Sequence, residues 1–201
     1  MQDQIAGIVA AAVGFIVLTI IASTNIRGQQ AAIEAQQFMT AKKSAIDFST
    51  MMAQDFRNIG ANYPAYPLSP DSAISLFDTV STPRVFAFTG QASRGLPPSL
   101  IRYEWDVAGT ISVRDGKVQY YQVKRFVNGQ LSGSSTGAVT SFRIRLRGAD
   151  GGDILTVADT RQIEVSLRIV SPFGSGRLIE WVRLNEVVHP QALSRYDSVT
   201  S

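Results

Sequence analysis

Three alternating arginines are the first residues whose type and spacing suggest chemistry. Arg143, Arg145 and Arg147 stand at every second position of SFRIRLR. Alternation places them on one face of a β-strand, where guanidinium groups can bind nucleic-acid phosphates without sequence preference. Lys124 and Arg125 are candidate neighbouring cations. The alternative is a solvated strand face whose arginines pair with carboxylates across the sheet. The three arginines are therefore a candidate binding surface for a polyanion, and nucleic acid is the specific polyanion considered.

The segment GADGGDILTVAD offers carboxylates for a metal ion. Asp150 and Asp153 are the calcium candidates within it. Calcium takes six or more oxygen ligands, and this segment lacks the spacing of a dedicated calcium loop. An ordinary turn is the simpler interpretation, and we expect no resident metal or cofactor.

The composition argues against an enzyme. The 201 residues include no cysteine and one histidine, His189, which stands beside Pro190. Thiolate metal sites are therefore excluded, and so is nearly all catalysis that depends on histidine. No nucleophile elbow or phosphate loop occurs either. The formal net charge of +3 is mild and requires no acidic partner.

Alternating apolar residues predict the sheet that positions these side chains. The period of two is clearest over 100–107, 141–147 and 163–169, with a last strand expected within 177–188. Asp-Gly at 115–116 and Asn-Gly at 128–129 are typical of tight hairpins. We expect about five to seven antiparallel strands from residue 85 onward. The prolines of residues 60–84 predict a loop there, with a short helical turn at 73–77.

The N-terminal segment predicts a helix that crosses a membrane. Residues 4–26 carry no charge and would span roughly 35 Å as a helix, against a hydrocarbon thickness of about 30 Å. Small residues such as Gly7 and Gly14 allow close approach of other helices. This helix is therefore either a lipid-facing anchor or one that packs against copies of itself.

The helix is expected to continue as an amphipathic one, with Gly60 as its stop. Its apolar residues are Ile33, Met39, Ile46, Met52, Phe56 and Ile59. This apolar side should pack on the sheet. The prediction is an α+β protein whose long N-terminal helix has a membrane-spanning first half (1–27) and an amphipathic second half (28–60), packed on an antiparallel β-sheet head domain (61–201).

This organisation resembles the type IV pilin and pseudopilin superfamily, most closely the minor pilins and minor pseudopilins with a large β-domain. The resemblance is carried by AQDFRNIGAN, DGKVQYYQVKR, GAVTSFRIRLRGADGGDI and TRQIEVSLRIVSP, followed by RLIEWVRL. The family usually has an acidic residue where this sequence has Ile5. Asp3, the nearest carboxylate, would either replace it or lie among lipid headgroups. The family also has a basic leader that is cut off. Either Met1 is the processed end, or this is a divergent filament protein that skips the step.

The resemblance implies a structural subunit of a type IV pilus-like filament or secretion pseudopilus. Assembly would involve the helix residues Met1, Asp3, Gly7 and Gly14. The implied partners are copies or other pilin-like subunits, an inner-membrane platform and an ATPase. The subunit would cross the inner membrane before assembly and then form an extracellular or periplasmic filament at a bacterial surface. The alternative is a membrane-anchored, outward-facing binding module that contacts DNA or a surface and does not polymerise.

Overall fold

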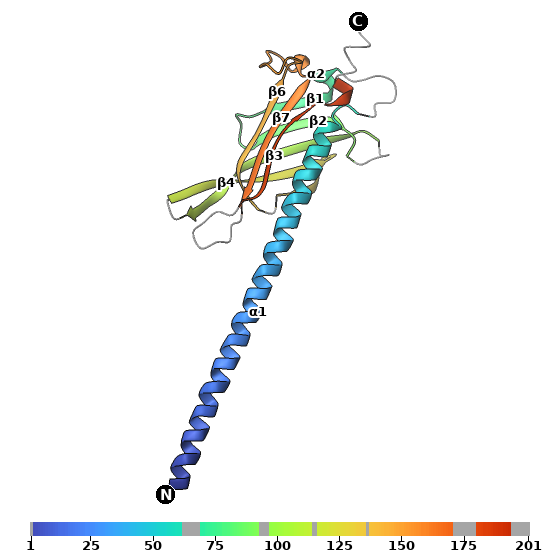
Figure 1. Cartoon of the computed structure of the whole chain (residues 1–201). Helices are drawn as coiled ribbons and strands as arrows, with labels where there is room; N and C mark the ends of the chain where they lie inside the picture. The colour runs from blue at the N-terminus through green and yellow to red at the C-terminus, as the bar shows by residue number, and fades with distance from the viewer. Residues whose placement is uncertain are drawn as a thin grey trace. The chain divides into compact units, whose positions relative to one another are not determined.

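The computed structural model describes residues 2–61, 69–92, 97–113, 116–135, 137–170 and 180–193, with side chains omitted for 2–12, 113, 180 and 181. The chain divides into two compact units, Met1–Thr40 and Ala41–Ser201. Helix α1 (Gln2–Arg57) supplies every described residue of the first unit and also the opening residues of the second (Figure 1).

The first half of α1 corrects the fold prediction. Among the side chains that the structure describes, which begin at Val13, no helix is long and apolar enough to cross a membrane. The apolar part of α1 whose side chains are described runs over 13–26, and polar Thr19, Ser23 and Thr24 interrupt it. The membrane-spanning part of the prediction is therefore wrong, whereas the long helix and the α+β class are confirmed.

The second unit contains an antiparallel sheet of eight strands within the described residues, in the order β1-β2-β3-β4-β6-β7-β8 with β5 added beside β4. The strands are β1 (Ile74–Asp78), β2 (Arg84–Gly90), β3 (Ser99–Val113), β4 (Gly116–Val127), β5 (Gln130–Ser134), β6 (Ala138–Arg147), β7 (Gln162–Val170) and β8 (Glu180–Val188). A short 3-10 helix, η1 (Val157–Asp159), precedes β7.

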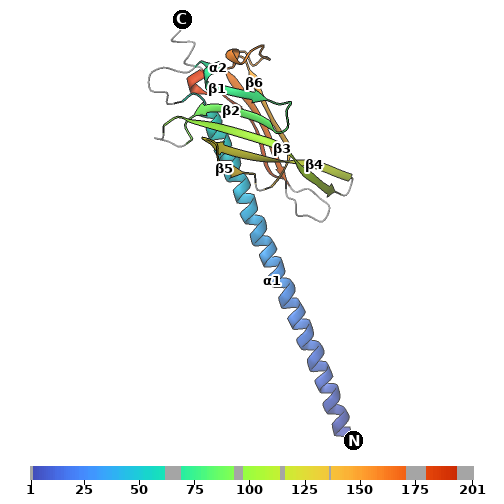
Figure 2. The same cartoon turned by 180° about the vertical axis from the view of Figure 1, so that it is seen from behind.

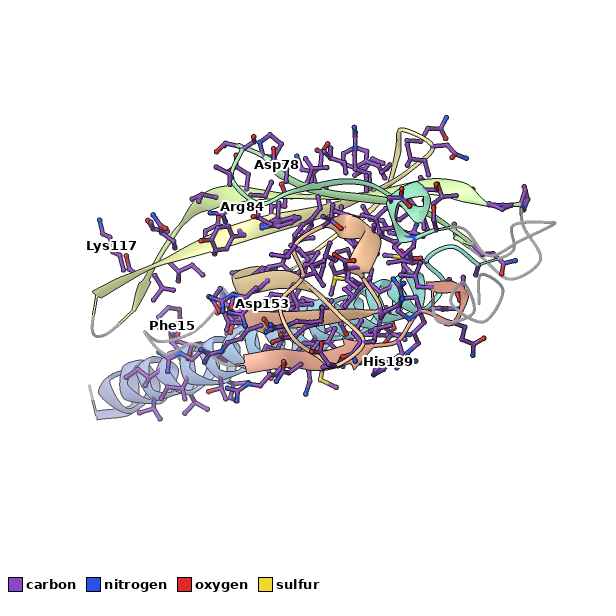
Figure 3. The ribbon with its side chains drawn as sticks, turned by 90° about the horizontal axis from the view of Figure 1, so that it is seen from above. Phe15, Asp78, Arg84, Lys117, Asp153 and His189 are labelled. Atoms are coloured by element: carbon purple, nitrogen blue, oxygen red, sulfur yellow. The ribbon has the colours of Figure 1, made fainter. Side chains whose placement is uncertain are left out.

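The sheet divides between β4 and β6. These two strands share a single register pair, Tyr121↔Val139, whereas β3 and β4 pair continuously from Ile101↔Val127 to Val113↔Gly116 apart from one bulge. In Figure 3 the strands β1–β4 and the strands β6–β8 accordingly lie at different levels. Where β4 and β6 separate, a space remains between the two halves of the sheet.

The end of α1 packs on the sheet through aromatic residues. The Phe56 ring centroid lies 5.6 Å from that of Phe86, 5.7 Å from Phe88 and 5.3 Å from Tyr103, all with edge-on geometry. Both views of the ribbon show these last turns against the strands (Figures 1 and 2). Met52 and Ile59 are also fully buried, which confirms the predicted apolar face over the last turns.

Further back along α1, the predicted apolar face is wrong. Ile33, Met39 and Ile46 are exposed, whereas Ala45 and Phe48 are buried. The buried stripe of the second unit thus follows 45, 48, 52 and 56, a spacing of three and four residues that keeps one side of a helix inward. Ile46 lies one residue, or about 100°, off this stripe.

The segment that follows α1 also differs from prediction. Helix α2 (Pro70–Ala73) and strand β1 occupy a stretch expected to be a loop, and the helical turn expected at 73–77 is wrong because β1 covers all but its first residue. Residues 62–68 lie outside the described residues. Strand β1 pairs with β2 through a bulge between Ile74 and Leu76, so its alternation is too short and irregular to be seen in the sequence. The expected helix stop is close: α1 ends at Arg57, and Gly60 has φ +70°.

Candidate functional site

Exposed apolar side chains surround α1 from Val13 to Ile26. The large ones are Val13, Phe15, Ile16, Val17, Leu18, Ile20, Ile21 and Ile26, each between 48% and 72% exposed. Because neighbouring residues of a helix are about 100° apart, the consecutive residues Phe15 to Leu18 point in every direction. Figure 3 labels Phe15 on this part of the helix. A helix that is apolar all round belongs in an interior.

Hydroxyl groups on this surface are turned back onto the helix itself. Thr19 Oγ1 donates to Phe15 O at 2.8 Å, and Thr24 Oγ1 and Ser23 Oγ donate to Ile20 O at 2.8 and 2.9 Å. Their hydrogen-bonding needs are met within α1. The surface can therefore be covered by apolar groups without leaving these hydroxyls unpaired.

The residues predicted to act in filament assembly lie at the start of α1. Gly14 borders open space, since a Cβ built there would meet no heavy atom within 4 Å. Asp3 and Gly7 are helical, in the stretch where the side chains are not described, and Met1 lies outside the described residues. Their role in assembly stays a prediction.

A buried charged network fastens the end of α1 to β3 and β4. Asp55 Oδ2 accepts from Arg125 Nε at 2.6 Å and from Tyr103 Oη at 2.5 Å, and Asp55 Oδ1 accepts from Arg125 Nη2 at 2.9 Å. Arg125 Nη1 also donates to Ser132 Oγ at 2.7 Å. Asp55 and Arg125 are only 2% and 3% exposed. The pairing is bidentate, the strongest geometry for these two groups.

The network perturbs two titratable groups. Burial raises the pKa of Tyr103 well above its ordinary value, and the neighbouring Asp55 charge raises it further. Burial lowers the pKa of Arg125, but the hydrogen bonds and charge of Asp55 outweigh this and leave it raised. Arg125 is thus an internal structural cation and not, as considered from the sequence, a surface neighbour of the alternating arginines.

Two of the three alternating arginines line a groove between the two halves of the sheet. Arg143 and Arg145 of β6 border a space of about 430 Å³. Across it lie Arg84 of β2, Trp105 of β3 and Tyr121 of β4. Arg84 is labelled in Figure 3 beside Asp78, which ends β1. The groove forms where β4 and β6 part, so strands far apart in sequence supply its arginines.

Arg147 is engaged elsewhere. Its Nε and Nη2 donate to Glu164 Oε2 at 3.1 and 2.9 Å, and it also pairs with Asp153. The hydrogen bond with Glu164 raises the pKa of Arg147. Arg145 approaches the same Glu164 oxygen only at 3.8 Å. Within the described part of the chain, Arg143 has no carboxylate partner. The cross-strand pairing considered from sequence thus exists mainly at Arg147.

The candidate metal ligands have structural partners. Asp150 Oδ1 accepts from the Gly152 N–H at 2.9 Å inside a turn where Gly151 has φ +79°, and Asp153 pairs with Arg147. Across the described ranges, no three histidine or acidic side chains gather where they could hold a metal ion. His189 follows β8 and is exposed.

Sequence reasoning missed Arg84 and the Asp55–Arg125 pair. Both depend on contacts between distant segments, and neither has a local periodic signal. Searches with family models, curated proteins and solved structures find no match to this chain.

Proposed function

We propose that this protein is a structural subunit of a pilus-like or pseudopilus-like filament that assembles through the first part of α1. The supporting observation is the apolar surface that surrounds the helix over 13–26. The proposed neighbours are copies of this chain or other subunits of the same kind. An assembly platform and an ATPase, and a place in an extracellular or periplasmic bacterial filament, belong to the same proposal through the resemblance in sequence organisation.

An all-round apolar surface favours several neighbours over one. A single partner helix would cover one side, whereas Phe15, Ile16, Val17 and Leu18 face different sides. Head-to-tail contacts that do not close produce an open helical array, in which every subunit is surrounded in the same way. The helix would then form the interior of the assembly, and the sheet unit would be carried by it.

The energy available from this surface is sufficient for association. Full burial of a large apolar side chain is worth about 1.5–3 kcal/mol. Eight such side chains, each about half exposed, offer on the order of 10 kcal/mol per subunit. Part of this is spent on immobilising the subunits. The remainder suits an assembly in which each subunit has several contacts.

Removal of residues 1–26 tests the proposal. We expect the shortened chain to remain folded and monomeric, because the buried contacts of the sheet unit lie within Ala41–Ser201. Sedimentation and negative-stain electron microscopy should show fibres for the full chain and none for the shortened one. Fibres formed by the shortened chain would rule out assembly through this helix.

A point substitution gives a finer test. Leu18→Glu places one carboxylate within the apolar surface, where burial without a partner is costly. We expect it to abolish fibres. The matched control is Gln36→Glu, which adds the same charge at an exposed position of the same helix. Equal effects of the two substitutions would contradict the proposal.

A further inference from the structure

We propose that the groove between β4 and β6 is a binding site for a small oxyanion-bearing molecule, one that carries phosphate or carboxylate groups. Arg84, Arg143 and Arg145 line it from two strands, and none of the described lining residues is acidic. Its volume of about 430 Å³ lies within the range of roughly 300–1,000 Å³ typical of small-molecule sites. This inference concerns the sheet unit alone and does not depend on filament assembly.

The charge in the groove is largely uncompensated. Glu164 pairs with two arginines of β6: it accepts two hydrogen bonds from Arg147 and lies 3.8 Å from Arg145. Arg143 has no ion-pair partner among the residues described. A planar guanidinium matches the two oxygens of a carboxylate or phosphate, so a groove bordered by several arginines favours such a ligand.

The opposite wall is already ordered. Arg84 Nε donates to Thr79 O at 3.1 Å, and the guanidinium carbon lies 5.8 Å from the centroid of the Tyr121 ring. Trp105 beneath it is buried edge-on against Phe142, with ring centroids 5.0 Å apart. A guanidinium held in this way loses less conformational entropy on binding than a free surface side chain.

Thr140, whose hydroxyl is unsatisfied within the described part of the chain, is also a lining residue of the groove. Thr140 Oγ1 is buried and has no hydrogen-bond partner among the residues described. Burying a polar group without a partner costs free energy, so such a group is typical of a place completed by water or ligand. Ser141 lies beside it in the lining. Serine and threonine hydroxyls commonly donate to phosphate oxygens.

These features favour a compact anion over a nucleic acid. A strand that contacted successive phosphates would use Arg143, Arg145 and Arg147, which are spaced about 6.8 Å apart along β6. Arg147 is paired with Glu164 and Asp153, and Arg84 lines the groove across from Arg143 and Arg145. The arginines that border the groove therefore come from two strands and do not form a single line along β6.

Equilibrium dialysis of the full chain tests the proposal with three probes: inorganic pyrophosphate, citrate and a single-stranded oligothymidylate of about ten nucleotides. We expect saturable binding of pyrophosphate or citrate with one site per chain. Whichever of these two probes binds more tightly shows whether phosphate or carboxylate is the preferred group. We expect the oligothymidylate to bind no more tightly than pyrophosphate.

Substitutions locate the site. Arg143→Gln and Arg84→Gln should each weaken binding about tenfold or more, since each removes a charged hydrogen-bond donor. Thr140→Val, which keeps the side-chain shape, should weaken it about threefold or more. The matched control is Lys117→Gln at the β3–β4 hairpin, an exposed position that does not line the groove, with an expected change below about twofold.

Three results would overturn the inference. One is no saturable binding of pyrophosphate or citrate up to about 10 mM, which corresponds to negligible affinity. Another is equal weakening by Lys117→Gln and Arg143→Gln, which would indicate general electrostatic attraction. The last is binding of the oligothymidylate at least about tenfold tighter than pyrophosphate, lost in Arg147→Gln, which would indicate a linear nucleic-acid surface. Arg143 is exposed, so its substitution tests the site even if Arg84→Gln disturbs folding.

Discussion

Replacement of Arg125 by methionine should destabilise the sheet unit strongly. The substitution leaves Asp55 buried without its bidentate partner, since Arg125 supplies both short contacts at 2.6 and 2.9 Å. Removal of one member of a buried ion pair typically costs about 3–5 kcal/mol, because the remaining charge is uncompensated. Tyr103 still donates one hydrogen bond to Asp55, which places the expected cost toward the lower end, about 3 kcal/mol.

A second substitution should recover part of that loss. Asp55→Leu combined with Arg125→Met removes both charges and leaves apolar side chains of similar volume. Tyr103 then loses its acceptor, at a cost of about 1–3 kcal/mol. We expect the double variant to be more stable than Arg125→Met by at least about 1 kcal/mol, a non-additive result typical of residues in contact.

Urea unfolding of the full chain, followed by tryptophan fluorescence, measures these differences. Arg57→Met is the matched control, because it also removes the arginine of an ion pair between α1 and the sheet, that of Arg57 with Glu186, but the Arg57 side chain is 62% exposed. Exposed pairs contribute about 0–1 kcal/mol. If Arg125→Met cost no more than Arg57→Met, or if the double variant equalled the sum of the single ones, the assignment of a buried charged network would be refuted.

Three further predictions concern Tyr103, Gly60 and Gly28. The pKa of Tyr103 is raised in the folded state, so its protonated hydroxyl stabilises the folded protein. This contribution to the free energy of unfolding is fully present below about pH 10 and is lost as the pH rises above that value. The wild type should lose about 1.4 kcal/mol per pH unit there relative to Tyr103→Phe, as measured by urea midpoints between about pH 8 and 11. Gly60→Ala should destabilise by about 1–2 kcal/mol, since φ is +70° and the new Cβ would lie 3.1 Å from the Ala192 Cβ. Gly28→Ala, in open helix, should raise helicity by circular dichroism, with a gain of about 0.5–1 kcal/mol; a loss of helicity would contradict this reasoning.

Local periodicity was sufficient for much of the fold. Strands β6 and β7 alternate over 142–147 and 163–169, and the apolar spacing of Met52, Phe56 and Ile59 correctly placed the inward face of α1. Both signals come from residues a few positions apart, so no tertiary information was needed. Strand β1, which is only five residues long and bulged, gave no such signal.

The pairing of neighbouring strands determines which of the alternating arginines has a carboxylate partner, and the sequence alone could not show this. The alternating arginines look equivalent in the sequence, yet Arg147 lies opposite Gln162 at the end of β6, within reach of Glu164 and Asp153. Arg143 lies opposite Ser166 and gains no such partner. Arg84 also lines the groove. It lies there because β2 pairs with β3 in a register that sets Arg84 opposite Trp105, and because β4 and β6 separate beyond their single register pair. A pattern of charge therefore identifies a face, and the neighbouring strands determine which members of it are free to bind.

The buried pair also explains how a long helix is held in one register. Packing of Met52, Phe56 and Ile59 is apolar and repeats with the helical turn, so a slip of α1 by one turn would still bury apolar residues. Such a slip would place Met51 or Ile59 near Arg125 and leave two charges buried without partners, at a cost of several kcal/mol. Asp55 thus selects one register among several similar ones, a role in which buried polar groups are well attested.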